Sequence, residues 1–174
     1  MTSMAADRVT IPAAGDYRID PARTTVSFAT RHLFGLAPVR GTFQLRDGHI
    51  QVTEPVADSS ARAVIAASTF HTGLPARDTH VRGPAYLDAE RHPAIVFAST
   101  GLEQVEGRWM LRGSLTVRDR TCPLDLRVEE LTAGPTLTLR ATTWVDRYAF
   151  GITAMKGMTG RRLTLTLSVT ATRT

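Results

Sequence analysis

Residues 161–171 read RRLTLTLSVTA, and this stretch decides the fold. Leu163, Leu165, Leu167 and Val169 occupy every second position, and the residues between them are threonine or serine. Successive side chains of a β-strand point to opposite faces of the sheet, so this pattern places an apolar row and a polar row back to back. The stretch is therefore predicted to be a strand with one face on an apolar core.

The same period of two recurs along the chain. Apolar or small side chains share one face in four further runs, at residues 26–32, 39–45, 109–117 and 137–145. Typical turn pairs punctuate the chain, namely Asp47-Gly48, Glu106-Gly107, Gly134-Pro135 and Lys156-Gly157. The runs amount to about eight antiparallel strands, the number at which a closed barrel has room inside for side chains or one small ligand. We therefore predict an all-β, about eight-stranded antiparallel barrel.

One long polar connection interrupts the strands, TGLPARDTHVRGPAYLDAERHPAIVFAST at residues 72–100. Within it, PARDTHVRG favours one or two short helical turns with Pro75 at the first position. A second break, HLFGLAP at residues 32–38, is long enough for a turn only. Apolar residues in the two breaks would lie across a barrel end, either as a lid or as a structural cap. These residues are Leu33, Phe34, Leu36, Val81 and Tyr86.

Composition indicates a single soluble globular domain. The 174 residues are 43% hydrophobic and 21% charged, and the net charge is +5. Lys156 is the one lysine among 21 basic residues, and the arginines are scattered without a basic block, so we expect no nucleic-acid partner. Residues 1–15 contain Asp7 and Arg8 and lack the apolar run of an export signal, which predicts a flexible N-terminal arm and a cytoplasmic protein. No window is apolar enough to span a membrane.

Two interpretations compete with ligand binding inside the barrel: a metal-dependent enzyme or metalloprotein, and a basic surface that docks on an anionic polymer or membrane. His32, His80 and His92 offer imidazoles for a metal-dependent enzyme or metalloprotein, but no two of them have the spacing that preorganises a metal pair. Asp88 and Glu90 lack an accompanying nucleophile motif, and lone Cys122 has no CxxC partner. We therefore expect no enzyme activity, no metal and no other cofactor, with the histidine set kept as the alternative.

Five segments carry a resemblance to a known family: YRIDPARTTVSFATRH at 17–32, RGTFQLRDGHI at 40–50, the 72–100 stretch, GSLTVRDRTCPLDL at 113–126 and DRYAFGI at 146–152. In this order they resemble the YceI-like family of polyisoprenoid-binding proteins. The most specific part is the RDxH element at Arg77, Asp78 and His80. The resemblance implies one lipocalin-like β-barrel domain over residues 16–174, whose interior binds, sequesters or transports a polyisoprenoid or similar long-chain amphiphilic lipid without chemistry.

The residues themselves agree with an apolar interior. Large aromatic side chains alternate with small residues at Gly41, Gly113, Ala141 and Thr143, and we expect these small residues to leave room for a ligand. A few polar groups at the open end would select the head group. The expected ligand-binding residues are Phe28, Thr30, His32, Phe34, Arg40, Phe43, His80, Tyr86, Phe97, Trp144 and Arg147. Trp144 is the weakest of them, because its place in the alternation points it outward. We expect a monomer or homodimer that makes at most transient membrane contact.

Overall fold

The structure is a computed structural model that describes residues 7–174. More than half of these residues lie in β-strands, and the chain also forms one α-helix and three short 3-10 turns. In order the elements are β1 Arg8–Val9, β2 Gly15–Ile19, η1 Pro21–Arg23, β3 Thr25–His32, β4 Ala37–Val52, η2 Val56–Asp58, β5 Ser60–His71, α1 Pro75–Arg82, β6 Ala94–Val105, β7 Arg108–Val117, β8 Arg120–Thr132, β9 Thr136–Asp146, η3 Arg147–Phe150 and β10 Arg162–Arg173.

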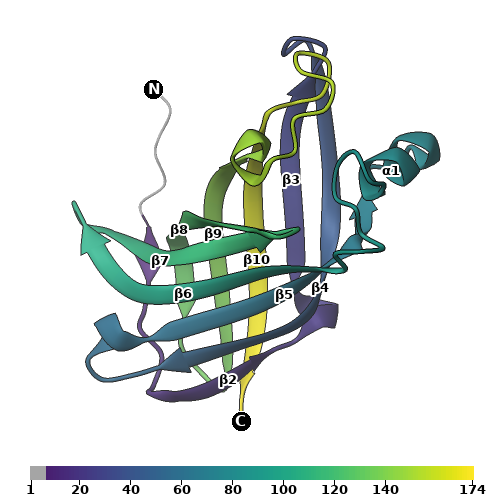
Figure 1. The fold of residues 1–174 in the computed structure, drawn as a ribbon. Helices are drawn as coiled ribbons and strands as arrows, with labels where there is room; N and C mark the ends of the chain where they lie inside the picture. Colours follow the sequence, from purple (N-terminus) through teal and green to yellow (C-terminus); the bar gives the residue numbers. More distant parts are fainter. Residues whose placement is uncertain (1–6) are drawn as a thin grey trace.

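Eight strands close into an antiparallel barrel (Figure 1). Each strand from β3 to β10 pairs with the next one along the chain, and β10 returns to pair with β3 through Leu165 opposite Phe28. Short β2 continues the wall beside β3, since it pairs with both β4 and β10. The predicted all-β, eight-stranded barrel is confirmed. The alternating apolar row of residues 163–169 points into it, as the period of two requires.

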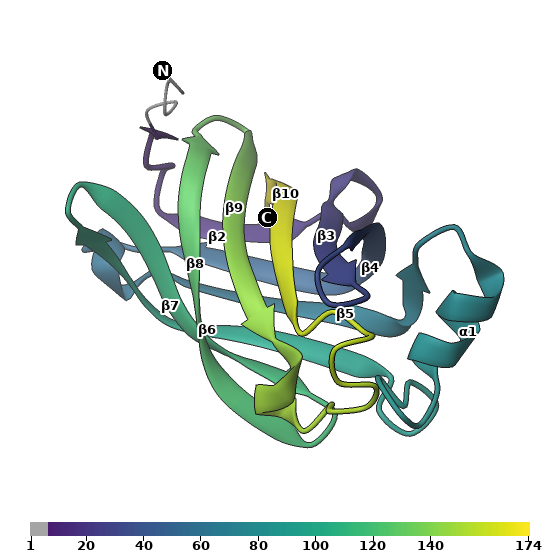
Figure 2. The same ribbon diagram turned by 90° about the horizontal axis from the view of Figure 1, so that it is seen from above.

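Helix α1 lies in the long connection between β5 and β6 and begins at Pro75, as predicted. Pro is favoured there because its missing N–H would have no partner in the first helical turn. Figure 2 shows α1 beside the barrel rather than inside it. None of the helices in residues 7–174 has both the length and the apolar character needed to cross a lipid bilayer.

The prediction of a turn at Asp47-Gly48 was wrong, because β4 continues through these two residues to Val52. A register shift between Leu45 and Asp47 bends the strand at this point. Gly48 allows the Ile19 side chain to pack close to the β4 backbone, because a Cβ placed on Gly48 would come within 2.6 Å of that side chain. A glycine inside a strand commonly marks such a contact or a bulge rather than the end of the strand.

Part of the expected flexible arm lies on the barrel. Residues 1–6 are outside the described residues, but β1 pairs in parallel with β8, with Arg8 opposite Glu130 and Val9 opposite Leu131. The Thr10 amide then donates to the Leu131 carbonyl at 2.8 Å. The chain after β1 therefore crosses one end of the barrel before β2 begins.

Candidate functional site

The barrel encloses a cavity of about 170 Å³. Its lining comes from every barrel strand and from β2, and it is apolar except for Arg62, Thr143 and Arg147. No carboxylate, thiol or imidazole is among the side chains that line it. Such an interior provides contact area for an apolar molecule, with one hydroxyl and two guanidinium groups as its polar side-chain groups.

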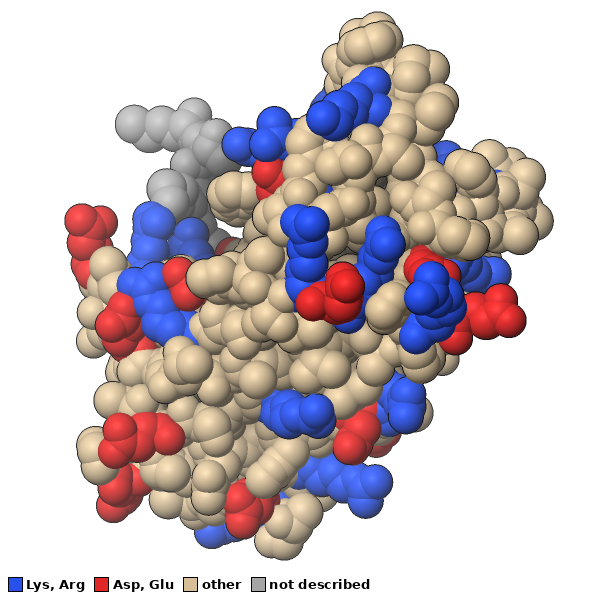
Figure 3. All heavy atoms as spheres, in the orientation of Figure 1, with Lys and Arg blue, Asp and Glu red and all other residues tan. Residues whose placement is uncertain are grey.

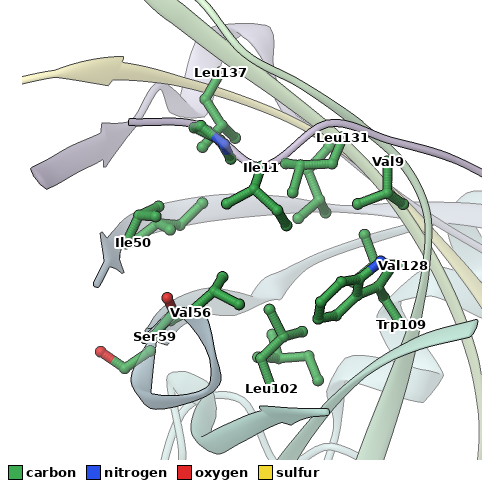
Figure 4. Close-up of a pocket in the computed structure, with 16 residues that line it drawn as sticks. Val9, Ile11, Ile50, Val56, Ser59, Leu102, Trp109, Val128, Leu131 and Leu137 are labelled. Carbon is green, nitrogen blue, oxygen red and sulfur yellow. The ribbon is translucent and has the colours of Figure 1, made fainter. Parts of the chain in front are cut away.

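A second apolar chamber of about 60 Å³ lies at the end of the barrel that the N-terminal segment crosses (Figure 4). Val9, Ile11 and Trp109 are part of its lining, and Ser59 and Ser60 are its only polar residues. Four residues line both this chamber and the main cavity: Ile50, Ala61, Leu111 and Leu139. The two spaces are therefore adjacent, and the four residues between them are all apolar.

The opposite end of the main cavity is lined by Leu87, Phe150, Ile152 and Arg147, and the ring of buried Tyr86 lies 5.8 Å from the Arg147 guanidinium. The Tyr86 hydroxyl shares a 2.7 Å hydrogen bond with Thr159, which ties the long connection to the 151–161 loop. His80 packs edge-on against the Tyr86 ring, with centroids 5.2 Å apart. This end is therefore closed by two loops that contact each other, rather than by the barrel wall.

Arg147 brings a buried positive charge to the closed end, since only 5% of its surface is exposed. Its guanidinium donates to three backbone carbonyls of the 151–161 loop: Gly160 at 2.9 Å, Ile152 at 2.8 Å and Thr159 at 3.1 Å. These bonds fix the loop across the end of the barrel. They satisfy the guanidinium donors without neutralising the charge, so the end of the cavity favours an anionic group.

The Asp78 carboxylate, 3% exposed, anchors α1 to the end of β5. It accepts hydrogen bonds from the backbone amide and the hydroxyl of Thr72, and Arg77 donates to that same hydroxyl at 2.9 Å. Burial raises the pKa of the Asp78 carboxyl, but the Thr72 hydrogen bonds, with the charges of His71 and Arg82, lower it more, so the pKa lies below its ordinary value. The Arg77 and Asp78 part of the RDxH element therefore has structural contacts.

His32 holds the 151–161 loop from the side of β3. The Gly160 amide donates to His32 Nδ1 at 2.7 Å, which requires that nitrogen to be unprotonated. Burial lowers the pKa of the His32 imidazole, and the positive charges of Arg77 and Arg147 lower it further. The ring is therefore neutral near pH 7, in the form that accepts this bond.

The expected ligand residues do not all meet at one place. Phe43, Phe97 and Arg147 line the cavity. Phe28 is buried and stacks on Phe70 next to Phe43, with ring centroids 5.2 Å apart, rather than facing the cavity. The other expected residues lie at or outside the closed end. Tyr86, His80 and His32 take part in the loop contacts at that end, and the Thr30 hydroxyl donates to the Arg162 carbonyl. Phe34, Arg40 and Trp144 are exposed on the outer surface.

The interior also differs from expectation at two glycines. A Cβ on Gly113 would come within 2.6 Å of the Phe97 ring, and one on Gly41 would clash with the Phe28 ring and the His71 carbonyl. These glycines therefore accommodate aromatic rings and do not leave room for a ligand.

Sequence reasoning did not identify Val9 and Ile11, which line the second chamber. Their alternation with polar Arg8 and Thr10 was a weak strand signal.

The alternative metal site receives no support from the geometry. Within residues 7–174, no three His, Cys, Asp or Glu side chains lie together as a metal would require. His32 bonds to Gly160 and His80 packs on Tyr86, while His92 lies 3.9 Å from an oxygen of Asp88. The three imidazoles are therefore engaged separately.

The chain is similar in sequence to proteins of several bacteria. The chain is 29% identical over 125 residues to a UPF0312 protein of Vibrio parahaemolyticus, which covers 70% of this chain and 66% of that protein. It is 30% identical over 125 residues to the protein YceI of Escherichia coli O157:H7, covering 70% of this chain and 64% of the relative. The chain thus spans slightly less than two thirds of the length of these relatives.

Two solved structures share the fold. Burkholderia cenocepacia BcnA superposes with a TM-score of 0.79 at 20% identity, over 88% of this chain and 99% of BcnA. A polyisoprenoid-binding domain from Saccharophagus degradans superposes with a TM-score of 0.69 at 12% identity, over 91% of this chain and 98% of that domain. The profile of the YceI-like domain matches residues 17–171. The chain therefore belongs to the YceI-like domain family.

Proposed function

We propose that the protein binds a polyisoprenoid or comparable long-chain lipid inside its barrel and sequesters or transports it without chemical change. The observation that carries this proposal is the pair of adjacent apolar chambers in the barrel, which share four apolar lining residues. Likeness to the polyisoprenoid-binding domain of Saccharophagus degradans supports the same ligand class. The absence of carboxylate, thiol and imidazole groups from the cavity lining argues for binding rather than catalysis.

The ligand tail would run from the Arg147 end toward the N-terminal chamber. Each methylene removed from water contributes about 0.8 kcal/mol, so a tail of modest length offsets the cost of association. The cavity of about 170 Å³ is smaller than the roughly 300–1,000 Å³ of ordinary ligand pockets. We therefore infer that the loops at the closed end move outward when a long chain enters. The buried charge of Arg147 favours an anionic or strongly polar head group at that end.

A charged residue in the cavity wall tests the proposal. Phe43 lines the cavity, and Phe43→Asp would place an unpaired carboxylate there, so we expect binding of a fluorescent lipid probe to be lost. Phe43→Leu keeps an apolar wall and serves as the matched control. A folded Phe43→Asp variant with the wild-type probe affinity would contradict binding in the interior. If the aspartate variant unfolds, displacement of the probe from wild-type protein by unlabelled isoprenoid alcohols of increasing length decides the question, and no displacement would contradict the proposal.

A further inference from the structure

The β3–β4 hairpin projects beyond the barrel rim (Figure 1). Exposed apolar side chains gather on this hairpin and on the loop bonded to it. We name this set the apolar tip; it consists of Leu33, Phe34 and Leu36 of the hairpin and Met155 and Met158 of the 151–161 loop. Phe34 is 78% exposed and Leu36 is 82% exposed. Five of the nine exposed large apolar side chains among the described residues belong to the tip. An exposed apolar cluster of this kind marks an interaction surface.

The two loops of the tip are held together by backbone hydrogen bonds. The Leu33 amide donates to the Met158 carbonyl at 2.8 Å, and the Phe34 amide donates to the Gly157 carbonyl at 2.6 Å. The Phe34 ring lies against Gly157, where any Cβ would clash with it. The apolar side chains therefore come from a fixed pair of loops that presents them to solvent together.

Basic residues surround the tip and acidic residues are absent from its two segments. Residues 29–46 and 147–164 contain no Asp or Glu. Exposed Arg31, Arg40, Lys156 and Arg162 lie in these segments, and we call them the basic collar. Strand register places Arg40 opposite Ala29 on β3, so the collar continues across the outer face of the sheet. Figure 3 shows the projecting end of the molecule free of acidic atoms on this face, with basic residues below it.

We propose that the apolar tip and basic collar dock the protein on the surface of an anionic phospholipid bilayer. Apolar side chains would enter the boundary between head groups and acyl chains, while the collar contacts lipid phosphates. Exposed Trp144, with the Arg162 guanidinium 4.7 Å above its ring, lies on the same outer face and suits the interfacial region that tryptophan favours. Complementary charge identifies the partner: an apolar tip alone would suit any apolar surface, whereas the collar selects a negative one.

Docking would bring the closed end of the barrel to the membrane. The 151–161 loop carries Met155 and Met158 on its outside and is bound to Arg147 and Tyr86 on its inside. The same loop thus belongs to both the tip and the closure of the cavity. The tip itself lies outside the barrel, so membrane docking stands independently of which ligand the interior binds.

Flotation with lipid vesicles tests the proposal. We expect the wild-type protein to float with vesicles of phosphatidylcholine and phosphatidylglycerol, to bind vesicles of phosphatidylcholine alone much more weakly, and to dissociate as salt is raised. The double variant Phe34→Ser, Leu36→Ser should lose binding. Arg31→Gln and Arg40→Gln should each weaken it about fivefold, the equivalent of about 1 kcal/mol for one basic residue at a charged surface.

The opposite hairpin between β6 and β7 offers matched controls. Val105 is 41% exposed there and Arg108 is exposed, so Val105→Ser and Arg108→Gln change the same chemistry away from the tip and should bind as the wild type does. No flotation of the wild type, equal binding to neutral vesicles, or wild-type binding by the tip double variant would overturn the proposal. A wild-type dimer that the tip variant converts to monomer, without vesicle binding, would also overturn it, because a second copy would then cover the tip.

Discussion

Ala61 of β5 lines both apolar chambers, so a large side chain there should shorten the lipid tail that the barrel accepts. Ala61→Phe places a ring between the main cavity and the N-terminal chamber of about 60 Å³. That chamber has the volume of about two water molecules at roughly 30 Å³ each, and a methylene group is of similar size. Two methylenes at about 0.8 kcal/mol each amount to about 1.6 kcal/mol, or roughly fifteenfold in affinity.

Competition against a fluorescent lipid probe measures this effect. We expect Ala61→Phe to lose about fifteenfold in affinity for alcohols long enough to reach the second chamber, and to keep wild-type affinity for shorter ones. Overpacking costs roughly 1–3 kcal/mol of stability, so thermal melting has to confirm that the variant is folded. Ala98→Phe on β6 is the matched control, because Ala98 lines neither chamber. An unchanged dependence on chain length in folded Ala61→Phe would refute a tail that passes this position.

Three further predictions concern the elements around the cavity. Asp78→Ala should lower the free energy of unfolding by about 1–3 kcal/mol, because it leaves the Thr72 donors unpaired, and thermal melting measures it. Because the folded pKa of Asp78 is lowered, the stability that its ionised carboxylate contributes is present above about pH 3.8 and is lost as the pH falls through the folded pKa. The wild type and Asp78→Asn should therefore converge in stability at that low pH. Parallel acid-unfolding curves for the two proteins would contradict this. The lowered pKa of His32 likewise makes its bond to Gly160 present above pH 6.5 and lost as the pH falls through the folded pKa, so the Gly160 amide resonance should titrate there in NMR spectra and stay constant in His32→Phe. Chelator treatment should leave the melting temperature unchanged, whereas stoichiometric zinc or iron and a clear drop in that temperature would favour the metalloprotein alternative.

The barrel was predictable because its signal is local. Alternation of apolar and polar residues at 163–169 indicates which side chains face inward, and about eight such runs indicate a sheet that closes into a barrel. The start of α1 was predictable for the same reason, since Pro75 can begin a helix but cannot continue a strand.

Features that depend on register between distant segments were not predictable. Gly48 has the appearance of a turn residue in the sequence, and only its position against Ile19 reveals a close contact inside β4. Gly41 and Gly113 suggested empty space, but the rings of Phe28 and Phe97 occupy it. Periodicity along one strand says nothing of what its neighbours place opposite, so the volume of the cavity was beyond sequence reasoning.

The exposed residues illustrate the same limit. Phe34 was expected to close the barrel or bind the ligand, because the break in the strand pattern at residues 32–38 was placed across a barrel end. In the structure it lies exposed on the hairpin that projects past the rim, whereas Tyr86, expected in the same role, is buried and bonds to Thr159. The length of that projection is set by where β4 stops pairing with β5, at Thr42 opposite His71, which no local pattern encodes.

Mass spectrometry of the purified protein tests lipid binding most directly. The intact protein would be measured under native conditions and its organic extract analysed separately, with Phe43→Asp purified in parallel. We predict a long-chain isoprenoid or similar lipid bound to the wild type in stoichiometric amount and lost from a folded Phe43→Asp variant. Wild-type protein that stays free of lipid, even after incubation with isoprenoid lipids of several chain lengths, would contradict the account.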